Sequence, residues 1–382
     1  MKAAGIGLLG LLALAGCEPP RAPEVTPPAP EGLAQVGFTD LPGWPQDTLA
    51  EALPALQRQC TRLAVLPVDT ALGGTGLAQT YGGRAGQWAE PCAAAKTLSP
   101  EADLHGFFER WFQPYRITEP GLVTGYFEPV LMGARHQGGV YQTPALARPT
   151  DLVTGDGVDA QGRPVLGRRV NGQVVPYFSR AEIEAGVIGD QSHALIWLSD
   201  PVDLFFAQIQ GAALVRLSDG GLVRLAFDGR NGRPYTPIGK ILAERGDLPA
   251  DQISMQSVRA WLDAHPGEAK AVMDRNESYV FFRFAGDADT AFGPPGAMGV
   301  YLTAGRSAAV DKRFVPMGVP LFVDSTIPDG RIWQHLVLAQ DLGSAIEGPA
   351  RLDIFFGTGA PAASWAGRMR QRGTVYVLLP RP

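Results

Sequence analysis

The 382-residue chain has few of the side chains that bind metals or nucleic acids. Its five histidines are His105, His136, His193, His265 and His335. They lack the close spacing of zinc ligands, so we expect neither a metal site nor a cofactor. The net charge is −5 and no block of lysine and arginine occurs, which argues against nucleic acid as a partner.

The apolar run at residues 6–14 is too short and too early for a membrane-spanning helix. It follows Met1-Lys2 and ends in LAGC at Cys17, which resembles a bacterial lipoprotein signal with its lipobox. The resemblance implies a signal peptide at 1–16 and lipidation of Cys17; a plain secretory signal is the alternative. Glu18 stands where inner-membrane retention signals carry Asp, which favours the periplasmic side of the outer membrane.

Residues 17–45 contain eight prolines, a composition that favours extended conformers over a packed core. We therefore expect a tether between the anchor and the folded part. Export also implies an oxidising compartment, in which cysteines tend to pair. Only Cys60 and Cys92 remain once Cys17 is lipidated, so a structural disulfide is favoured; two free buried cysteines are the alternative.

Four segments carry capping signals or helical periodicity, and we expect a helix in each. They are Thr48 to Leu63, with a capping box at Thr48 and Glu51 and with Pro54 in the first turns; Ser99-Pro100 through Phe112; Ser179 to Gly186; and residues 252–264.

Short strand-like segments dominate elsewhere. Residues 212–227 predict a hairpin around Asp219-Gly220-Gly221, with Arg216 and Arg224 on its polar face. Five further strands are predicted from SYVFFRF, VPLFVD, HLVLAQD, RLDIFFG and TVYVLLP in the final third. This density of short strands predicts a mainly β protein with a closed barrel or a sandwich.

Three acids in the final third follow or interrupt apolar stretches. They are Asp311, Asp341 and Asp353. Asp353 lies between Leu352 and Ile354, where desolvation raises the pKa of a carboxyl group, so it is either a paired structural acid or a proton donor. A Gly-rich turn with Gly343 and Gly348 joins the second acid to the third.

These aspartates, with DLGSAIEG (341–348) and RLDIFFG (351–357), resemble the three-aspartate domain of double-psi β-barrel proteins. VTGYFEP (123–129), FDGRNGRPYTPIGKIL (227–242) and RNESYVFFR (275–283) extend the likeness from about residue 45 to 379. Together they resemble the family of membrane-bound lytic murein transglycosylase A. The resemblance implies a mainly β fold with a double-psi β-barrel domain from residues 46–128 and 281–382. A second β-barrel domain, 129–280, is inserted; a few helices are peripheral, and a glycan groove follows the junction.

Site residues are implied by the same resemblance. Asp353 matches the catalytic acid and Asp341 the supporting acid, while Asp311 matches the first aspartate, for which a structural role is expected. Thr124 and Tyr126 match the strand that lines the groove.

Further groove contacts are expected at Gly343, Asp311 and Glu128, the last as a second groove acid beside Pro129. The chain carries GPARLD (348–353) where some relatives have a histidine just ahead of the aromatic-Asp pair.

The implied activity is cleavage of the β-1,4 bond between N-acetylmuramic acid and N-acetylglucosamine in peptidoglycan. Asp353 protonates the leaving oxygen and then takes the proton of the C6 hydroxyl, which attacks C1 of its own sugar and leaves a 1,6-anhydro end. A β-1,4-glycan hydrolase and a non-catalytic peptidoglycan-binding lipoprotein are the alternatives. Peptidoglycan strands, the membrane and cell-wall remodelling proteins are the expected partners.

Two roles stay open at this point. Asp341 either keeps Asp353 protonated or positions it, or caps the DLGS turn as an Asx-turn. Tyr126 either stacks on sugar faces or belongs to the barrel core.

Overall fold

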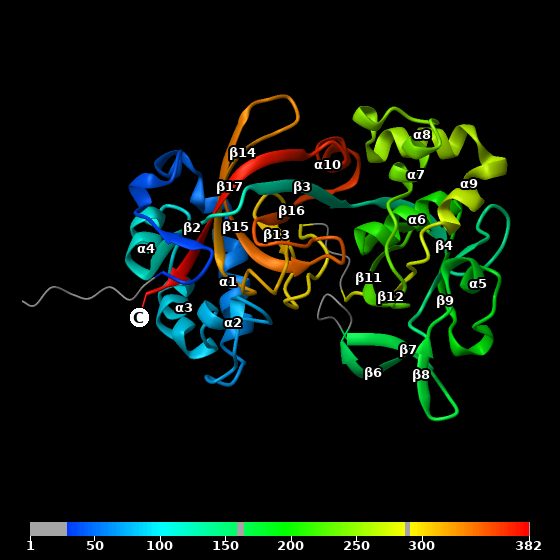
Figure 1. The fold of residues 1–382 in the computed structure, drawn as a ribbon, viewed down its shortest axis with the longest axis horizontal. Helices are drawn as coiled ribbons and strands as arrows, with labels where there is room; N and C mark the ends of the chain where they lie inside the picture. Colours follow the sequence, from blue (N-terminus) through cyan, green and yellow to red (C-terminus); the bar gives the residue numbers. More distant parts are fainter. Residues whose placement is uncertain (1–28, 159–163, 287–290, 382) are drawn as a thin grey trace, which may run out of the picture.

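The computed structural model in Figure 1 describes residues 29–158, 164–286 and 291–381. Two groups of strands lie side by side, and β3 (Gly121–Glu128) runs from the first group towards the second (Figure 1). The expected signal peptide, the lipidation site Cys17 and the start of the tether lie outside the described residues. Strands dominate the framework, which confirms the mainly β expectation.

The first group is an eight-stranded sheet that closes on itself. Its spatial order is β1 (Leu33–Gln35), β2 (Phe112–Ile117), β17 (Arg370–Pro380), β14 (Pro320–Thr326), β15 (Ile332–Leu342), β13 (Ser307–Val310), β16 (Arg351–Thr358) and β3. An additional pairing of β17 with β3 closes the strands from β17 to β3 into a six-stranded barrel. β13–β15 and β16–β3 are parallel, and the barrel is built from two distant parts of the chain, as expected.

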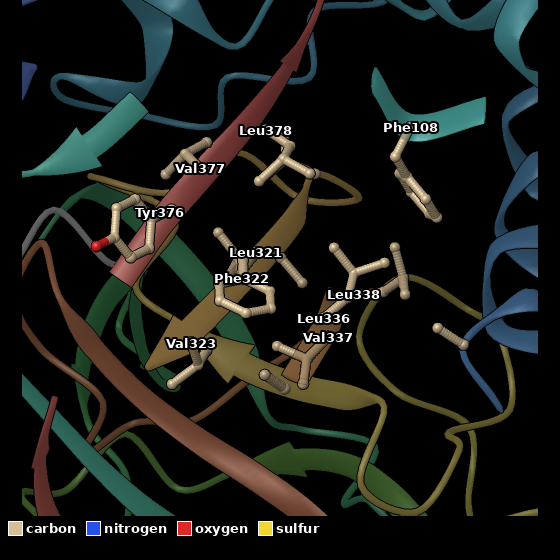
Figure 2. Close-up of a cluster of buried hydrophobic side chains, with 14 of the residues drawn as sticks. Phe108, Leu321, Phe322, Val323, Leu336, Val337, Leu338, Tyr376, Val377 and Leu378 are labelled. Carbon is tan, nitrogen blue, oxygen red and sulfur yellow. The ribbon is translucent and has the colours of Figure 1, made fainter. Parts of the chain in front are cut away.

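Side chains that point inward from the strands fill the barrel (Figure 2). Phe322 on β14 stands opposite Leu336 on β15 and Tyr376 on β17, and all three belong to one buried cluster. Because strand side chains alternate between faces, Leu352 and Ile354 of β16 enter this core. Asp353, between them, therefore points to the other face of the strand.

The second group is a six-stranded sheet in the order β12 (Val280–Phe284), β11 (Leu222–Arg230), β10 (Ala212–Leu217), β4 (Val130–Ala134), β9 (Ala194–Leu198) and β5 (Thr143–Leu146). One β-bridge between Ala147 and Phe282 joins its two edges, which closes it into a second barrel. A separate sheet of β6 (Val153–Val158), β7 (Pro164–Val170) and β8 (Gln173–Pro176) lies beside it (Figure 1). β12 belongs here, so the expected boundary at residue 281 is a few residues too early.

Helices cover both barrels. They are α1 (Leu53–Leu63), α2 (Ala78–Tyr81), α3 (Ala89–Lys96), α4 (Leu104–Trp111), α5 (Arg180–Glu184), α6 (Pro201–Gln210), α7 (Ile238–Glu244), α8 (Met255–Ala264), α9 (Pro266–Asp274) and α10 (Gly359–Ala366). Residues of α1, α3 and α4 pack into the core of the first barrel, and α6 to α9 share a cluster beside the second.

The four predicted helices are present, and three of them begin later than expected. α1 begins at Leu53 after a 3₁₀ turn, with Pro54 in its first turn, and Thr48 makes no side-chain cap. α4 begins late because Asp103 is its N-cap, and Phe112 belongs to β2. α8 begins at Met255, while the Ser179–Glu182 capping box of α5 is confirmed.

The prediction of a tether at residues 17–45 is wrong for the second half of that segment. β1 pairs with β2 at residues 33–35, and Leu33, Leu41 and Trp44 are buried in the first core. These apolar side chains anchor the Pro-rich segment, because their burial outweighs the stiffness of the neighbouring prolines. The folded part therefore starts earlier than residue 46.

The predicted disulfide between Cys60 on α1 and Cys92 on α3 is confirmed. It closes a loop with a sequence separation of 32 residues. Loop-closure entropy then predicts that the double variant C60A/C92A loses about 3–4 kcal/mol of unfolding free energy. Denaturant unfolding of the oxidised protein and the variant measures this, and an equal midpoint for the two would contradict it.

Candidate functional site

A groove with a volume of about 790 Å³ lies between the two barrels. The first barrel contributes the predicted residues Tyr126, Asp311, Asp341, Gly343 and Asp353. The second barrel and its neighbours contribute, among others, Arg148, Gln210, Phe227, Gly229 and Arg283. Both domains therefore form the walls of one groove, as the sequence predicts.

The strand register brings two of the three aspartates into one row. Ala309 of β13 pairs with Asp353 of β16 on one side and with Asp341 of β15 on the other. Directly paired residues point to the same face of a sheet, so both carboxyl groups face the groove. Two strand spacings separate their Cα atoms by roughly 10 Å.

A β-bulge at Gln340 aims Asp341 at the groove. The register shifts between Ala308 and Ala309, which leaves Gln340 as the extra residue of β15. The buried Gln340 side chain accepts a hydrogen bond from Ser307 Oγ (2.7 Å) and donates one to Ala55 O (3.0 Å). These bonds hold the bulge in place, because a buried amide without partners would be costly.

Asp353 lies on the groove floor with its carboxyl group largely desolvated. Burial raises the pKa of Asp353 to about 6, although the Thr124 hydrogen bond and the Arg351 charge both favour the carboxylate; the Asp341 charge adds to the rise. A pKa near 6 allows the group to donate a proton and to accept one near neutral pH. This matches the behaviour expected of Asp353 from its apolar neighbours.

A hydrogen-bond relay fixes which oxygen of Asp353 can carry the proton. Arg351 Nη1 donates to Thr124 Oγ1 at 2.8 Å, and Thr124 Oγ1 lies 2.5 Å from Asp353 Oδ1. A guanidinium group only donates, so the Thr124 hydroxyl must direct its own hydrogen to Oδ1. Within the described residues Oδ2 has no hydrogen-bond partner, which leaves Oδ2 to hold the acidic proton.

Asp341 is held by three donors. Tyr126 Oη donates to its Oδ2 at 2.7 Å, and the backbone N–H groups of Ala297 and Leu342 donate to Oδ1 at 2.9 Å each. Burial nevertheless raises the pKa of Asp341 above its usual range. The contact with Leu342 involves the next residue, whereas an Asx-turn uses the residue after it, so the Asx-turn interpretation is not supported.

Of the two roles left open for Tyr126, the structure favours the buried one. Its ring packs against Phe355 with centroids 5.4 Å apart and is buried within a small cluster. Its hydroxyl lines the groove and bonds Asp341, and burial raises the pKa of Tyr126 well above that of a free tyrosine. The buried ring has little surface for a sugar, so the geometry favours a positioning role.

Asp311 and Gly343 line the same groove. Asp311 accepts hydrogen bonds from the Arg313 guanidinium and from Gly348 N (2.9 Å). Burial opposes its ionisation, but these donors keep the pKa of Asp311 below its usual value. Its oxygens are thus engaged in holding the Gly-rich turn, which agrees with the structural role expected of it.

Glu128 is not a groove acid. It is fully buried, and its Oε1 and Oε2 accept hydrogen bonds from Arg224 Nε (2.6 Å) and Nη2 (3.1 Å). Thr358 Oγ1 adds a third bond at 2.8 Å. Arg224 is therefore buried rather than on the polar face of its hairpin, since a buried carboxylate needs a cation. The hairpin itself and the exposure of Arg216 are confirmed.

Four further residues at the site were not predicted. Arg351 donates a hydrogen bond to Thr124, and the backbone N–H of Ala297 donates one to Asp341. Thr75 lies between Gly74 and Gly76 and lines the groove, and its buried hydroxyl has no partner among the described residues. Tyr235 lies near enough to Asp353 for that charge, after burial, to raise the pKa of Tyr235. Arg351 and Tyr235 stand in stretches that the resemblance had marked, RLDIFFG and FDGRNGRPYTPIGKIL, whereas Thr75 and Ala297 do not.

Within the described ranges no three His, Cys, Asp or Glu side chains group so as to hold a metal ion. No helix of those ranges has both the length and the apolar character needed to cross a membrane.

A carboxyl group with a raised pKa on the floor of an open groove between two domains is the arrangement of an acid–base enzyme for an extended substrate. Residues 122–283 match the MltA specific insert domain, and residues 306–379 match the 3D domain. The chain belongs to the family of membrane-bound lytic murein transglycosylase A.

Individual relatives agree with this assignment. The solved membrane-bound lytic murein transglycosylase of Agrobacterium tumefaciens is 35% identical with a TM-score of 0.79, covering 92% of this chain and 98% of that one. MltA of Neisseria gonorrhoeae is 28% identical with a TM-score of 0.77, covering 94% and 98%. Membrane-bound lytic murein transglycosylase A of Escherichia coli K12 is 31% identical over 268 residues. That match covers 68% of this chain and 66% of the E. coli protein, just under two thirds of its length.

Proposed function

We propose that this protein is a peptidoglycan lytic transglycosylase that uses Asp353 as its single acid and base. The observation that carries this proposal is the Asp353 carboxyl group, desolvated on the groove floor and oriented through Oδ1 by Thr124. The relatives named above are lytic murein transglycosylases, which supports murein as the substrate.

The reaction needs two proton transfers by the same group. Oδ2 of Asp353 first protonates the bridging oxygen between N-acetylmuramic acid and N-acetylglucosamine, and the bond breaks through an oxocarbenium-like transition state. The resulting carboxylate is stabilised by the Thr124 hydroxyl and the Arg351 charge. It then removes the proton from the C6 hydroxyl, whose oxygen attacks C1 of the same sugar and forms the 1,6-anhydro ring. The acid is thereby restored.

Asp341 is poorly suited to act as a nucleophile. A retaining glycosidase places its two carboxyl groups about 5–5.5 Å apart, whereas these two residues stand two strands apart. Each Asp341 oxygen is also already engaged by a donor. We assign Asp341 to raising the pKa of Asp353 and to holding Tyr126 and the loop at Ala297.

The pH profile follows from the pKa of Asp353. The free enzyme must carry the proton on Asp353, so kcat/KM on glycan strands should fall as the pH rises through about 6. Turbidity loss of sacculi measured between pH 4 and pH 9 tests this. A flat profile across that range would contradict the role of Asp353 as acid.

The hydrogen-bond relay from Arg351 through Thr124 to Asp353 predicts that the pH profile of kcat/KM shifts in R351M. Arg351 lowers the pKa of Asp353, so its removal should move the fall in kcat/KM to higher pH. R351K retains the charge and should keep the wild-type midpoint more closely, although a lysine supplies a different geometry. An unchanged midpoint in R351M would show that the relay does not tune Asp353.

Incubation of the protein with isolated sacculi tests the proposed activity. Soluble muropeptides should appear with the wild-type protein. Sedimentation with sacculi and no soluble product would instead support the non-catalytic glycan-binding alternative.

For the cellular location we propose a lipid anchor at Cys17 on the periplasmic side of the outer membrane. The LAGC motif, Glu18 and the membrane-bound relatives support this. Metabolic labelling with a fatty-acid analogue should label the wild-type protein and leave C17A unlabelled.

A further inference from the structure

Two arginines of the second barrel lie next to each other on the groove wall. A parallel β-bridge pairs Ala147 with Phe282, so the residues that follow, Arg148 and Arg283, occupy neighbouring positions on one face. Both side chains are exposed, and both line the groove that contains Asp353.

Neither guanidinium group has an acidic partner within residues 29–158, 164–286 and 291–381. Arg148 Nη2 lies 3.5 Å from Leu152 O, and Arg283 Nη1 lies 3.4 Å from Phe284 O, both at the limit for a hydrogen bond. Most of their donors are therefore free for a ligand. Placing two like charges together is unfavourable unless an anion joins them.

The side chain of Arg148 packs against the backbone of β11 at Gly229. β11 has a bulge between Phe227 and Gly229, and Gly229 has a φ of +135°, which favours glycine. A Cβ atom at this position would lie 3.6 Å from Arg148 Cδ, so the arginine stem crosses the glycine backbone. Phe227 is 49% exposed on the same groove wall and offers an apolar surface beside the two charges.

We propose that Arg148 and Arg283 bind carboxylate groups of the peptide attached to N-acetylmuramic acid. This inference rests on the proposed function. The groove floor carries the acids Asp341 and Asp353, so the glycan suits the floor, because its backbone is uncharged where each lactyl carboxyl group is joined to a peptide. The stem peptide bears carboxylates, and each guanidinium group can bind a carboxylate through two parallel hydrogen bonds. The protein therefore recognises stem-bearing strands in preference to bare glycan.

The test compares intact glycan strands with strands whose peptides have been removed by an amidase, which removes the stem carboxylates and leaves a lactyl carboxylate on each N-acetylmuramic acid. The wild-type protein should have a KM about tenfold lower for intact strands, and R148A/R283A should lose most of that preference. R135A is the matched control, because Arg135 is an exposed arginine paired with Asp219 at 2.9 Å outside the groove lining. It should retain the wild-type preference.

Equal KM values of the wild-type protein for the two substrates would overturn the inference, as would an unchanged preference in R148A/R283A. Absence of product from both substrates would contradict the proposed function instead. The same variants would then be compared by sedimentation with intact and amidase-treated sacculi. A wild-type preference for intact sacculi that the double variant lacks would support stem binding, and its absence would reject it.

Discussion

D353N should lower kcat/KM on peptidoglycan strands by at least about a hundredfold, since positioned general acid–base groups contribute about 10²–10⁴ to rates. Asparagine has nearly the shape of aspartate and can still accept the Thr124 hydrogen bond, but it has no acidic proton. Binding to sacculi should persist because the groove is unchanged. Release of soluble muropeptides measures the loss.

The same substitution should not destabilise the fold. The pKa of Asp353 is raised to about 6, so between the pKa of an unfolded aspartate and about pH 6 the native state holds the extra proton. Wild-type stability therefore falls as the pH rises through this window. The stability of D353N does not fall in this way. Above pH 6, D353N should therefore unfold at a denaturant concentration equal to or higher than that of the wild-type protein. D329N, at an exposed carboxylate paired with Arg331, is the control and should remain fully active.

Wild-type activity in D353N would reject Asp353 as the acid. A matching loss of activity and stability would mean that the residue is structural.

E128A should destabilise the protein by about 3–5 kcal/mol, because it leaves the buried Arg224 without its carboxylate. Glu128 and Arg224 both have fully buried side chains, and Thr358 also loses its acceptor. The exposed pair of Arg135 and Asp219 provides the comparison, and D219A should cost less than about 1 kcal/mol. Denaturant unfolding of both variants measures the contrast.

The activity of E128A distinguishes a structural acid from a groove acid. Below its unfolding temperature the variant should keep kcat/KM close to that of the wild-type protein, since Glu128 does not reach the groove. A large loss of activity in a folded E128A, without a loss of stability, would restore Glu128 as a groove acid.

Local sequence patterns were sufficient for some features of the site, whereas the roles expected of Asp353 and Asp341 followed from the family resemblance. Asp353 interrupts an alternating strand, and that alternation alone places it opposite the core residues Leu352 and Ile354. The pairing of Cys60 with Cys92 followed from export and from the small number of cysteines. The closed barrels followed from many short strands together with the family resemblance.

Features that depend on distant partners could not be predicted. Glu128 pairs with Arg224, 96 residues away, and no local pattern marks the two as an ion pair. The relay needs β3 beside β16 in one specific register, and the bulge at Gln340 depends on α1 and β13. The burial of Leu33 and Trp44 could not be predicted for the same reason. The Pro-rich composition of their segment predicts an extended chain, but both side chains pack into a core formed by distant residues.

The central claim is that one aspartate cleaves the glycosidic bond without activating water. Mass spectrometry of products formed from sacculi in ¹⁸O-water tests it most directly. The account predicts new ends that are lighter than hydrolysis products by one water and that carry no ¹⁸O. Reducing ends with one ¹⁸O atom would identify a hydrolase and contradict the account.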